Sequence, residues 1–382
     1  MHGVSAPVPG ARWSAGDAPR RSPVPPGGRG LVHRITGALK EYDWGIPDGL
    51  AAWSGRSDGR PQAELWFGVH PTGPSPVVGT ETTLADACAV GEVPILVKLL
   101  AAAHPLSIQV HPNAEQAARG YAHQGDTAMY SDDQEKTELL VALEPFEAFC
   151  GWRDMGTAAR VLSELSNTDE AVRALESGDR EAALRALLEL ASTCDIRAWN
   201  AELPSAVERA RWNEADVAAY RTVVDEFPED PGIPVTVMLD RISLDVGDAV
   251  YVPAGIPHSY IRGIGLEVMT SSDNVLRMGL TGKPVHREEA IRCLDWSAAP
   301  VVIRGSDHIA PAGAPFSVDL VREATVASGD YRLLLGIDGP LTVEFPEWEV
   351  DVAVGEALAL TATDPAVRVR ASGRAAVVRA TA

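Results

Sequence analysis

A histidine at the end of an apolar run is the first feature of this sequence that could do chemistry. From Gly247 the chain reads Gly, five residues, Pro253, one residue, Gly255, two residues, His258. The run Ala249 to Val252 predicts a strand, and the Pro/Gly pair predicts a tight turn after it. His258 would then stand at the start of the next strand and face the interior of a barrel. An imidazole in that position is a candidate metal ligand.

A second histidine lies in the segment Pro105-Leu-Ser-Ile-Gln-Val-His-Pro-Asn113. Residues two apart in a strand share a face, so Gln109 and His111 point one way while Ile108 and Val110 point the other. Taken alone, such an alternation is more often a polar pair on a solvated face. The presence of a second candidate ligand, His258, favours the alternative, in which Gln109 and His111 face inward.

Glu138 can complete a metal-binding set with these residues. It enters the apolar strand Leu139 to Leu143, where an exposed glutamate would be the usual outcome. Combined with Gln109, His111 and His258, it gives two imidazoles, a carboxylate and an amide, which suit zinc or a comparable divalent ion. Water or substrate would fill an open position. The set therefore predicts a catalytic rather than a structural metal site.

A polar segment beyond Glu267 carries further charges, at Asp273, Arg277 and Lys283. As structure alone, this is a turn with solvated side chains. The chain has 33 basic residues and a net charge of -20, and lysine is rare among its basic residues. Arg277 and Lys283 in so acidic a chain suggest a local positive pocket able to hold a phosphate. Each lysine is a candidate for a task that needs an ammonium group with an adjustable pKa.

Composition excludes several classes of partner. The net charge of -20 speaks against nucleic acid and anionic membranes, which require clustered Lys and Arg. No apolar stretch reaches the length of about 20 residues that a membrane-spanning helix needs. The four cysteines include no CxxC pair, so a reducing, cytoplasmic location is expected. Residues 1–30 are rich in Pro, Gly, Ser and Arg and are expected to form a disordered leader.

The pattern along the chain predicts a mainly β protein with a helical insert. Short apolar runs separated by turn residues predict strands at 63–69, 95–100, 107–110 and 138–143. From Asp154 to about Phe227, Ala and Leu recur at helical spacing, notably at 157–165 and 180–190. Strands are expected again at Pro234 to Leu239 and from Ile242 to Met269. A separate β domain is expected from about Pro315 onward.

Several stretches in one order make the chain resemble the type I mannose-6-phosphate isomerases, which have the cupin fold. The resemblance covers most of the chain from about Leu31. One departure is Glu135, which stands where the family commonly has histidine before the lysine of its metal-ligand motif. A proton-relay role for that position is therefore in doubt. The matching stretches are Tyr42 to Gly45, Ala63 to Pro71, Pro105 to Asn113, Glu144 to Arg153, Pro253 to His258, and Ser272 to Arg277.

The resemblance implies two cupin jelly-roll barrels with an α-helical insert domain. The expected catalytic domain spans 31–153 and 234–300, the insert 154–233, and the C-terminal barrel 301–382. The C-terminal barrel is expected to be metal-free, because Thr361 stands where the cupin motif has proline and Ala366 where it has the metal histidine. One Zn²⁺ per chain is implied, bound by Gln109, His111, Glu138 and His258. The implied catalytic residues are Arg277, Lys136, Asp273 and Glu267, and the substrate-binding residues are Lys98, Ser107, Tyr260 and Lys283.

The implied reaction interconverts mannose 6-phosphate and fructose 6-phosphate through a cis-enediol. A divalent ion would stabilise the charge on the sugar oxygens. Because a cation nearby lowers the pKa of a lysine, Lys136 is the first candidate base, with Glu267 and Asp273 as competitors. Two rival functions are an iron-dependent cupin oxygenase, against which Gln109 argues, and a non-catalytic sugar-phosphate binding protein. The expected partner is a small sugar phosphate, with no nucleic acid or membrane, and the chain is expected to be a monomer.

Overall fold

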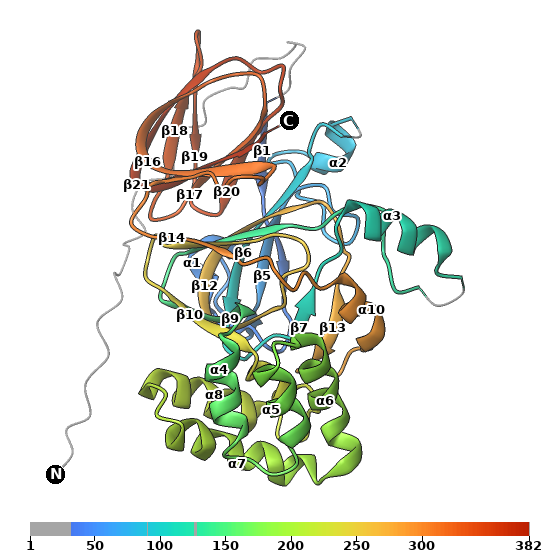
Figure 1. Ribbon diagram of the computed structural model, residues 1–382. Helices are drawn as coiled ribbons and strands as arrows, with labels where there is room; N and C mark the ends of the chain where they lie inside the picture. The colour runs from blue at the N-terminus through green and yellow to red at the C-terminus, as the bar shows by residue number, and fades with distance from the viewer. Residues whose placement is uncertain (1–31, 90, 126–127, 382) are drawn as a thin grey trace, which may run out of the picture.

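The computed structural model describes residues 32–89, 91–125 and 128–381. The predicted leader at residues 1–30 lies outside these residues. Figure 1 shows three parts in a row, with a C-terminal sheet at one end, a larger sheet in the middle and a bundle of helices at the other end. The prediction of a mainly β fold with helical parts is confirmed.

The larger sheet holds the strands that carry the predicted site. Within the described residues it contains eleven strands, and the central order β11, β8, β12, β6, β5 is antiparallel throughout. The strands predicted at 63–69, 95–100, 107–110 and 138–143 correspond to β5, β6, β7 and β8. The strands are β2 (Ala38–Lys40), β5 (Glu64–Phe67), β6 (Ile95–Ala102), β7 (Ile108–Val110), β8 (Glu138–Ala142), β9 (Phe146–Trp152), β10 (Leu239–Leu244), β11 (Ala249–Val252), β12 (His258–Thr270), β13 (Leu276–Gly279) and β14 (Val301–Ile303).

Strand β6 illustrates why this sheet can hold charged residues inside. It is buried on both faces. Val97, Leu99 and Ala101 pack in the cluster that faces the C-terminal sheet, whereas Leu100 and Ala102 join the cluster inside the larger sheet. Because side chains alternate along a strand, Lys98 shares the inner face with Leu100. A charged residue is thereby placed within the sheet by the same alternation that buries its neighbours.

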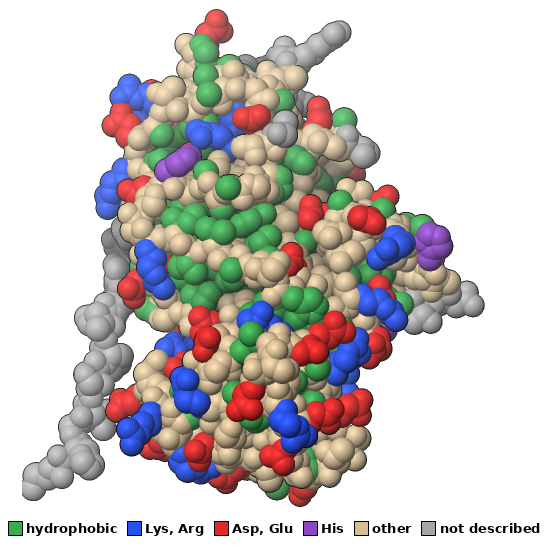
Figure 2. Space-filling model, viewed as in Figure 1, with side chains coloured by type: hydrophobic (Ala, Val, Ile, Leu, Met, Phe, Trp, Pro, Cys, Tyr) green, Lys and Arg blue, Asp and Glu red, His purple; other side chains and the backbone are tan. Residues whose placement is uncertain are grey.

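The helical insert leaves the larger sheet after β9 and returns at β10. Its helices pack around an apolar core that includes Leu184, Leu187 and Tyr220, and Figure 2 shows acidic and basic side chains spread over the visible face of this bundle. Side chains of Asp154, Asp179, Asp195 and Asn213 cap four of the helices, which explains where these helices begin. The helices are α4 (Met155–Leu162), α5 (Asp169–Glu176), α6 (Arg180–Thr193), α7 (Ile196–Arg209), α8 (Glu214–Glu226) and α9 (Ile233–Thr236).

The strand predicted at Pro234 to Leu239 is wrong for most of its length. Residues Ile233–Thr236 form α9, and β10 begins only at Leu239. Pro234 suits the first turn of a helix, where a backbone N–H donor is not needed. The Tyr220 hydroxyl donates to the Thr236 carbonyl at 2.9 Å and ties α9 to the bundle.

The C-terminal sheet contains eight strands among the described residues. Two pairings cross the domain boundaries expected from the sequence: β1 pairs with β20 of this sheet, and β14 pairs with β11 of the larger sheet. The two sheets therefore exchange one strand at each end. The strands are β1 (His33–Thr36), β15 (His308–Ile309), β16 (Phe316–Val326), β17 (Tyr331–Gly336), β18 (Leu341–Glu344), β19 (Glu349–Val352), β20 (Glu356–Leu360) and β21 (Val367–Ala380).

The remaining elements are short. Strands β3 (Ile46–Pro47) and β4 (Pro61–Gln62) form a small ribbon. Helices α1 (Ala51–Ser54), α2 (Leu84–Ala87), α3 (Ala114–His123) and α10 (Arg287–Cys293) lie around the larger sheet (Figure 1). None of the described helices combines the length and the apolar character needed to cross a membrane.

Candidate active site

Three predicted ligands meet inside the larger sheet. His111 follows β7, Glu138 begins β8 and His258 begins β12, as the sequence predicts. Their ligand atoms all lie within 4.8 Å of one another, and the three residues are buried. His111 Nε2 is 3.2 Å from Glu138 Oε1, and His258 Nε2 is 3.3 Å from Glu138 Oε2.

The hydrogen bonds of the two histidines indicate that a cation belongs between them. Nδ1 of His111 lies 2.8 Å from the Asn274 carbonyl, and Nδ1 of His258 lies 3.0 Å from the Ile256 carbonyl. A carbonyl only accepts, so each Nδ1 carries the proton and each Nε2 of a neutral ring presents a lone pair. Two lone pairs then face one carboxylate, and His111 Nε2 and Glu138 Oε2 have no hydrogen-bond partner in the described part of the chain. The donor set fits a divalent metal ion.

The protonation states suit the same role. Burial lowers the pKa of His111 to about 4, which leaves the ring neutral near pH 7. Burial opposes ionisation of Glu138, but the charge of Lys136 holds the pKa of Glu138 well below its ordinary value. Lys136 Nζ lies 3.0 Å from Glu138 Oε1. A neutral imidazole and an ionised carboxylate are the forms that bind metal.

Gln109, the fourth ligand predicted from the sequence, lies beside His258. Strand β7 lies between β12 and β13, so that Gln109 is opposite both His258 and Arg277. Its Nε2 lies 3.1 Å from His258 Nε2. The two ends of an amide are exchangeable by rotation about its last bond, so its oxygen can take that place and face a cation.

Two local structures hold these ligands in place. Gly255, in the turn before His258, has φ 84°, and an added Cβ would lie 2.9 Å from Asp295 Cβ, so glycine is required there. On the other side, Asp132 accepts hydrogen bonds from Ser272 and Asn274 and fixes the loop whose carbonyl orients His111. No sequence pattern indicated the roles of Asp132 and Asn274, because these two residues contact each other across 142 positions of the chain.

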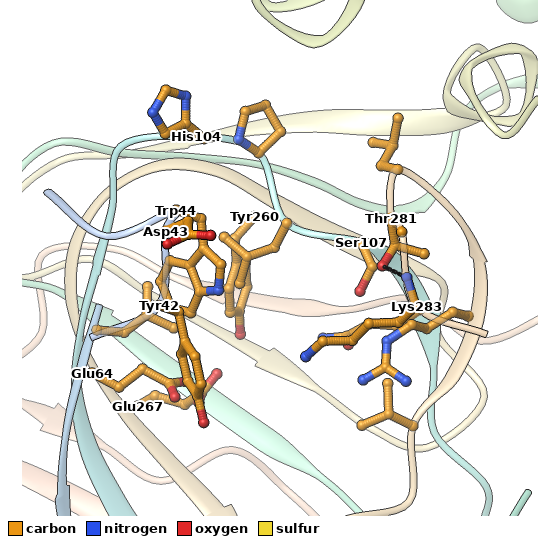
Figure 3. A pocket seen from close by; sticks show the side chains of 18 of the residues that line it. Tyr42, Asp43, Trp44, Glu64, His104, Ser107, Tyr260, Glu267, Thr281 and Lys283 are labelled. Atoms are coloured by element: carbon orange, nitrogen blue, oxygen red, sulfur yellow. Dashed lines mark hydrogen bonds between the residues drawn. The ribbon is translucent and has the colours of Figure 1, made fainter. Parts of the chain in front are cut away.

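A cavity of about 610 Å³ opens above the ligands. Figure 3 shows its two sides: Tyr42, Asp43, Trp44, Glu64 and Glu267 lie on one, and Ser107, Thr281 and Lys283 lie on the other. Every residue predicted to be catalytic or substrate-binding lines the cavity, as do Gln109 and Glu138. Glu135 does not line it.

The acidic side contains a buried charge network. Lys98 Nζ lies 3.1 Å from Glu267 Oε2 and 3.5 Å from Glu64 Oε1, and the three side chains come from neighbouring strands β6, β12 and β5. Burial opposes the charge of Lys98, but the carboxylates of Glu64 and Glu267 raise its pKa above the ordinary value. Burial also raises the pKa of Glu267. Lys98 is thus a fixed cation.

The opposite side carries two cations, Arg277 and Lys283, and no carboxylate among the residues that the structure describes pairs with either. Burial lowers the pKa of Arg277, and no ion pair to it occurs within the described residues. Lys283 Nζ lies 5.8 Å from the centre of the Tyr42 ring. Between them, Leu280 adopts φ 55°, a strained conformation for a branched residue, and this turn brings Thr281 and Lys283 over the cavity. Arg277 lies in strand β13 rather than in the polar loop expected from the sequence.

The structure also brings unpredicted residues to the site. Glu64 and Trp44 line the cavity, and Glu226 and Phe227 at the end of α8 contribute to its rim. Glu226 pairs with His104 at 2.9 Å. The matching stretches at 42–45 and 63–71 already contained Trp44 and Glu64, but nothing in the sequence indicated that the helical insert reaches the cavity.

The fold and site together define a metal-dependent enzyme of the cupin type. A sequence profile described as phosphomannose isomerase type I, catalytic domain, matches residues 32–155. A mannose-6-phosphate isomerase of Aspergillus fumigatus is 30% identical over 347 residues, with 75% of each chain covered. The chain belongs to the type I phosphomannose isomerase family.

Further comparisons cover nearly the whole chain. The mannose-6-phosphate isomerase of Escherichia coli (strain K12) is 29% identical over 391 residues, which are 91% of this chain and 99% of that protein. A crystal structure of mannose 6-phosphate isomerase bound with zinc and yttrium superposes with a TM-score of 0.79 at 26% identity, covering 92% of this chain and 100% of that one. A variant of phosphomannose isomerase from Salmonella typhimurium gives a TM-score of 0.80 at 25% identity, with the same coverage.

Proposed function

We propose that this chain interconverts mannose 6-phosphate and fructose 6-phosphate through a cis-enediol intermediate. One zinc ion per chain would be bound by Gln109, His111, Glu138 and His258. A single observation carries the proposal: the cavity joins a set of converging metal donors to a side with cations that lack carboxylate partners. A divalent ion at one end and an anion site at the other suit a sugar phosphate.

The two ends of the cavity would bind different parts of the substrate. When bound, zinc would supply Lewis acidity for the negative charge that develops on the sugar oxygens. Arg277 and Lys283 would attract the phosphate or the developing enediolate, with Ser107 as a further hydrogen-bonding group. Tyr260 is buried and its hydroxyl has no hydrogen-bond partner within residues 32–89, 91–125 and 128–381, which supports a role in donating to a substrate oxygen.

Proton transfer between C2 and C1 requires a base in the cavity. We keep Lys136 as the first candidate, because its Nζ lies beside Glu138 and therefore beside the metal position. Glu267 ranks second, since burial raises its pKa and makes it a stronger base than an exposed carboxylate. Asp273 ranks third, because a hydrogen bond from His70 lowers its pKa. Lys98 would position Glu267 and contribute positive charge.

The location, oligomeric state and domain organisation of the chain are also proposed. We propose a cytoplasmic monomer with a catalytic domain at 31–153 and 234–300, an insert at 154–233 and a metal-free C-terminal barrel at 301–382. The strand exchange of β1 and β14 modifies the ends of these ranges. Apolar side chains such as Leu334 and Leu358 fill the C-terminal sheet, which supports the absence of a second metal site.

A turnover experiment in D₂O tests the reaction. The chain, supplied with zinc, would be incubated with mannose 6-phosphate, and products would be followed by a coupled assay and by NMR. The proposal expects fructose 6-phosphate, with deuterium entering at C1 to the extent that the transferred proton exchanges with solvent. Unphosphorylated mannose is the matched control and should react far more slowly. If mannose 6-phosphate is bound but not converted, the chain is a binding protein instead.

A further inference from the structure

His70, in the loop after β5, makes a short contact with a cavity residue from a distant part of the chain. Its Nε2 lies 2.6 Å from Asp273 Oδ2. The His70 side chain is 10% exposed, whereas that of Asp273 is 50% exposed and lines the cavity. We propose that His70 is a positioning residue, which holds one carboxylate oxygen of Asp273 so that the other faces the sugar.

The hydrogen bonds of His70 define which nitrogen carries its proton. The Thr72 backbone N–H donates to Nδ1 at 3.2 Å, and the Thr72 hydroxyl lies 3.0 Å from the same nitrogen. A backbone N–H can only donate, so Nδ1 of the neutral ring is the acceptor and Nε2 carries the hydrogen. His70 therefore donates to Asp273. The ring also packs edge-on against Trp66, with centroids 4.8 Å apart, which fixes its orientation.

The main chain of Asp273 is fixed as firmly as the side chain of His70. The Asp273 backbone N–H donates to Asp132 Oδ2 at 2.9 Å. Asp132 also binds Ser272 and Asn274, whose carbonyl orients the ligand His111. With the backbone held on one side and Oδ2 held on the other, the carboxylate has little rotational freedom. Its Oδ1 is left as the acceptor for a ligand in the cavity.

The electrostatic setting keeps Asp273 ionised. The hydrogen bond from His70 is the largest cause that lowers the pKa of this carboxyl, and Lys136 and Lys98 act in the same direction. An ionised, oriented carboxylate accepts hydrogen bonds from hydroxyl groups, of which a sugar has several. This inference rests on the proposed isomerase function, because it assigns Asp273 Oδ1 to a hydroxyl of the reacting sugar. Orienting residues of this kind act on catalysis without touching the substrate.

Substitutions of His70 separate positioning from packing. His70→Phe keeps a ring against Trp66 but removes the donor, and His70→Gln keeps an N–H donor near the place of Nε2. We expect His70→Phe to lower kcat by about 10- to 100-fold with little change in KM, the range observed when orienting partners are removed. His70→Gln should restore most of the loss. His308→Phe is the matched control, because it removes another His–Asp pair, 2.5 Å long, on the C-terminal sheet, and should leave kcat unchanged.

A double-mutant cycle provides the decisive comparison. In an Asp273→Asn background, His70→Phe should change kcat by less than about twofold, because the residue it positions is already altered. Equal losses in both backgrounds, or a His70→Phe enzyme with the kcat of the parent, would overturn the proposal. Wild-type turnover is measured first: a wild type that does not convert mannose 6-phosphate refutes the proposed function rather than the role of His70.

The tautomer of His70 can be measured without an activity assay. Nitrogen-15 NMR of the holoenzyme, with His70 assigned from the His70→Gln spectrum, reports which ring nitrogen carries the proton. We expect hydrogen on Nε2 and none on Nδ1 when the ring is neutral. The opposite tautomer would contradict the proposed hydrogen bond to Asp273 even if His70→Phe failed to fold.

Discussion

The two sheets of this protein are both built from antiparallel strands, but the larger sheet buries charged residues and the C-terminal sheet buries mainly apolar ones. In the larger sheet, neighbouring strands place Lys98 opposite Glu267, and Met269 opposite Glu138. In the C-terminal sheet, the corresponding interior has Leu334 opposite both Leu358 and Val377. Burying charged groups costs free energy that burying leucines does not. The larger sheet bears that cost at the strands that line its cavity.

Buried polar atoms without hydrogen-bond partners converge in the larger sheet, whereas the C-terminal sheet has one, Tyr331 Oη, among the described residues. Arg332 of the C-terminal sheet is fully buried, and its guanidinium donates to the carbonyls of five residues, so it is a structural group. In the larger sheet, three such atoms are buried near one cavity and have no partner among the residues described: His111 Nε2, Glu138 Oε2 and Tyr260 Oη. Unsatisfied polar atoms that converge indicate a ligand, whereas satisfied ones indicate structure.

The largest expected effect comes from removing the charge at the metal position. Glu138→Gln should eliminate bound zinc and lower kcat by about 10,000-fold, since losing several kcal/mol of charge stabilisation has that consequence. Zinc per chain would be measured by mass spectrometry alongside turnover. A variant that retains both zinc and turnover would mean that Glu138 is not a ligand. The buried charges of the larger sheet would then not indicate a metal site.

Substitution of Lys136 should cause the second-largest loss of kcat. Lys136→Met is expected to lower kcat roughly 1000-fold, within the range for loss of a general base, while zinc content stays near the wild-type value. Glu267→Gln and Asp273→Asn, measured in parallel, should cost less. Near-normal turnover in Lys136→Met would exclude this lysine as the base, and the largest loss among the other two would identify it.

A substitution in the C-terminal sheet should lower the stability of the protein without lowering its turnover. Leu334→Ala removes a fully buried side chain and should lower the free energy of unfolding by about 2–5 kcal/mol, with kcat unchanged at temperatures where the protein is folded. Denaturant unfolding and steady-state turnover would be measured on one preparation. If kcat falls in proportion to stability, the two interiors are not functionally separate.

The smallest effect is expected at the rim of the cavity. Lys283 is exposed, and Lys283→Ala should raise KM by about tenfold with little change in kcat, in a manner that weakens at high salt. Arg277→Ala, which removes a half-buried cation, should lower kcat as well. If Arg277→Ala raises KM alone, Arg277 binds the phosphate in the ground state and does not act on the transition state.

The sequence predicted which side chains converge, because the signals for His111, Glu138 and His258 are local. His258 follows a Pro/Gly turn whose glycine has a positive φ, and Gln109 and His111, two positions apart, both lie beside His258. The contribution of α8 to the cavity, and the contact between His70 and Asp273 across 203 positions, depend on long-range packing. No short motif encodes such contacts. The strand predicted at Pro234 failed because its apolar run is equally compatible with a buried helix.

The most direct test is to restore activity with metal. The chain would be freed of metal with a chelator and titrated with zinc, while turnover of mannose 6-phosphate and zinc per chain are measured on the same samples. Turnover that disappears on chelation and returns linearly up to one zinc per chain is the predicted result. Full turnover by a chain that holds no metal would contradict the assignment of the converging His111, Glu138 and His258 to a catalytic zinc site.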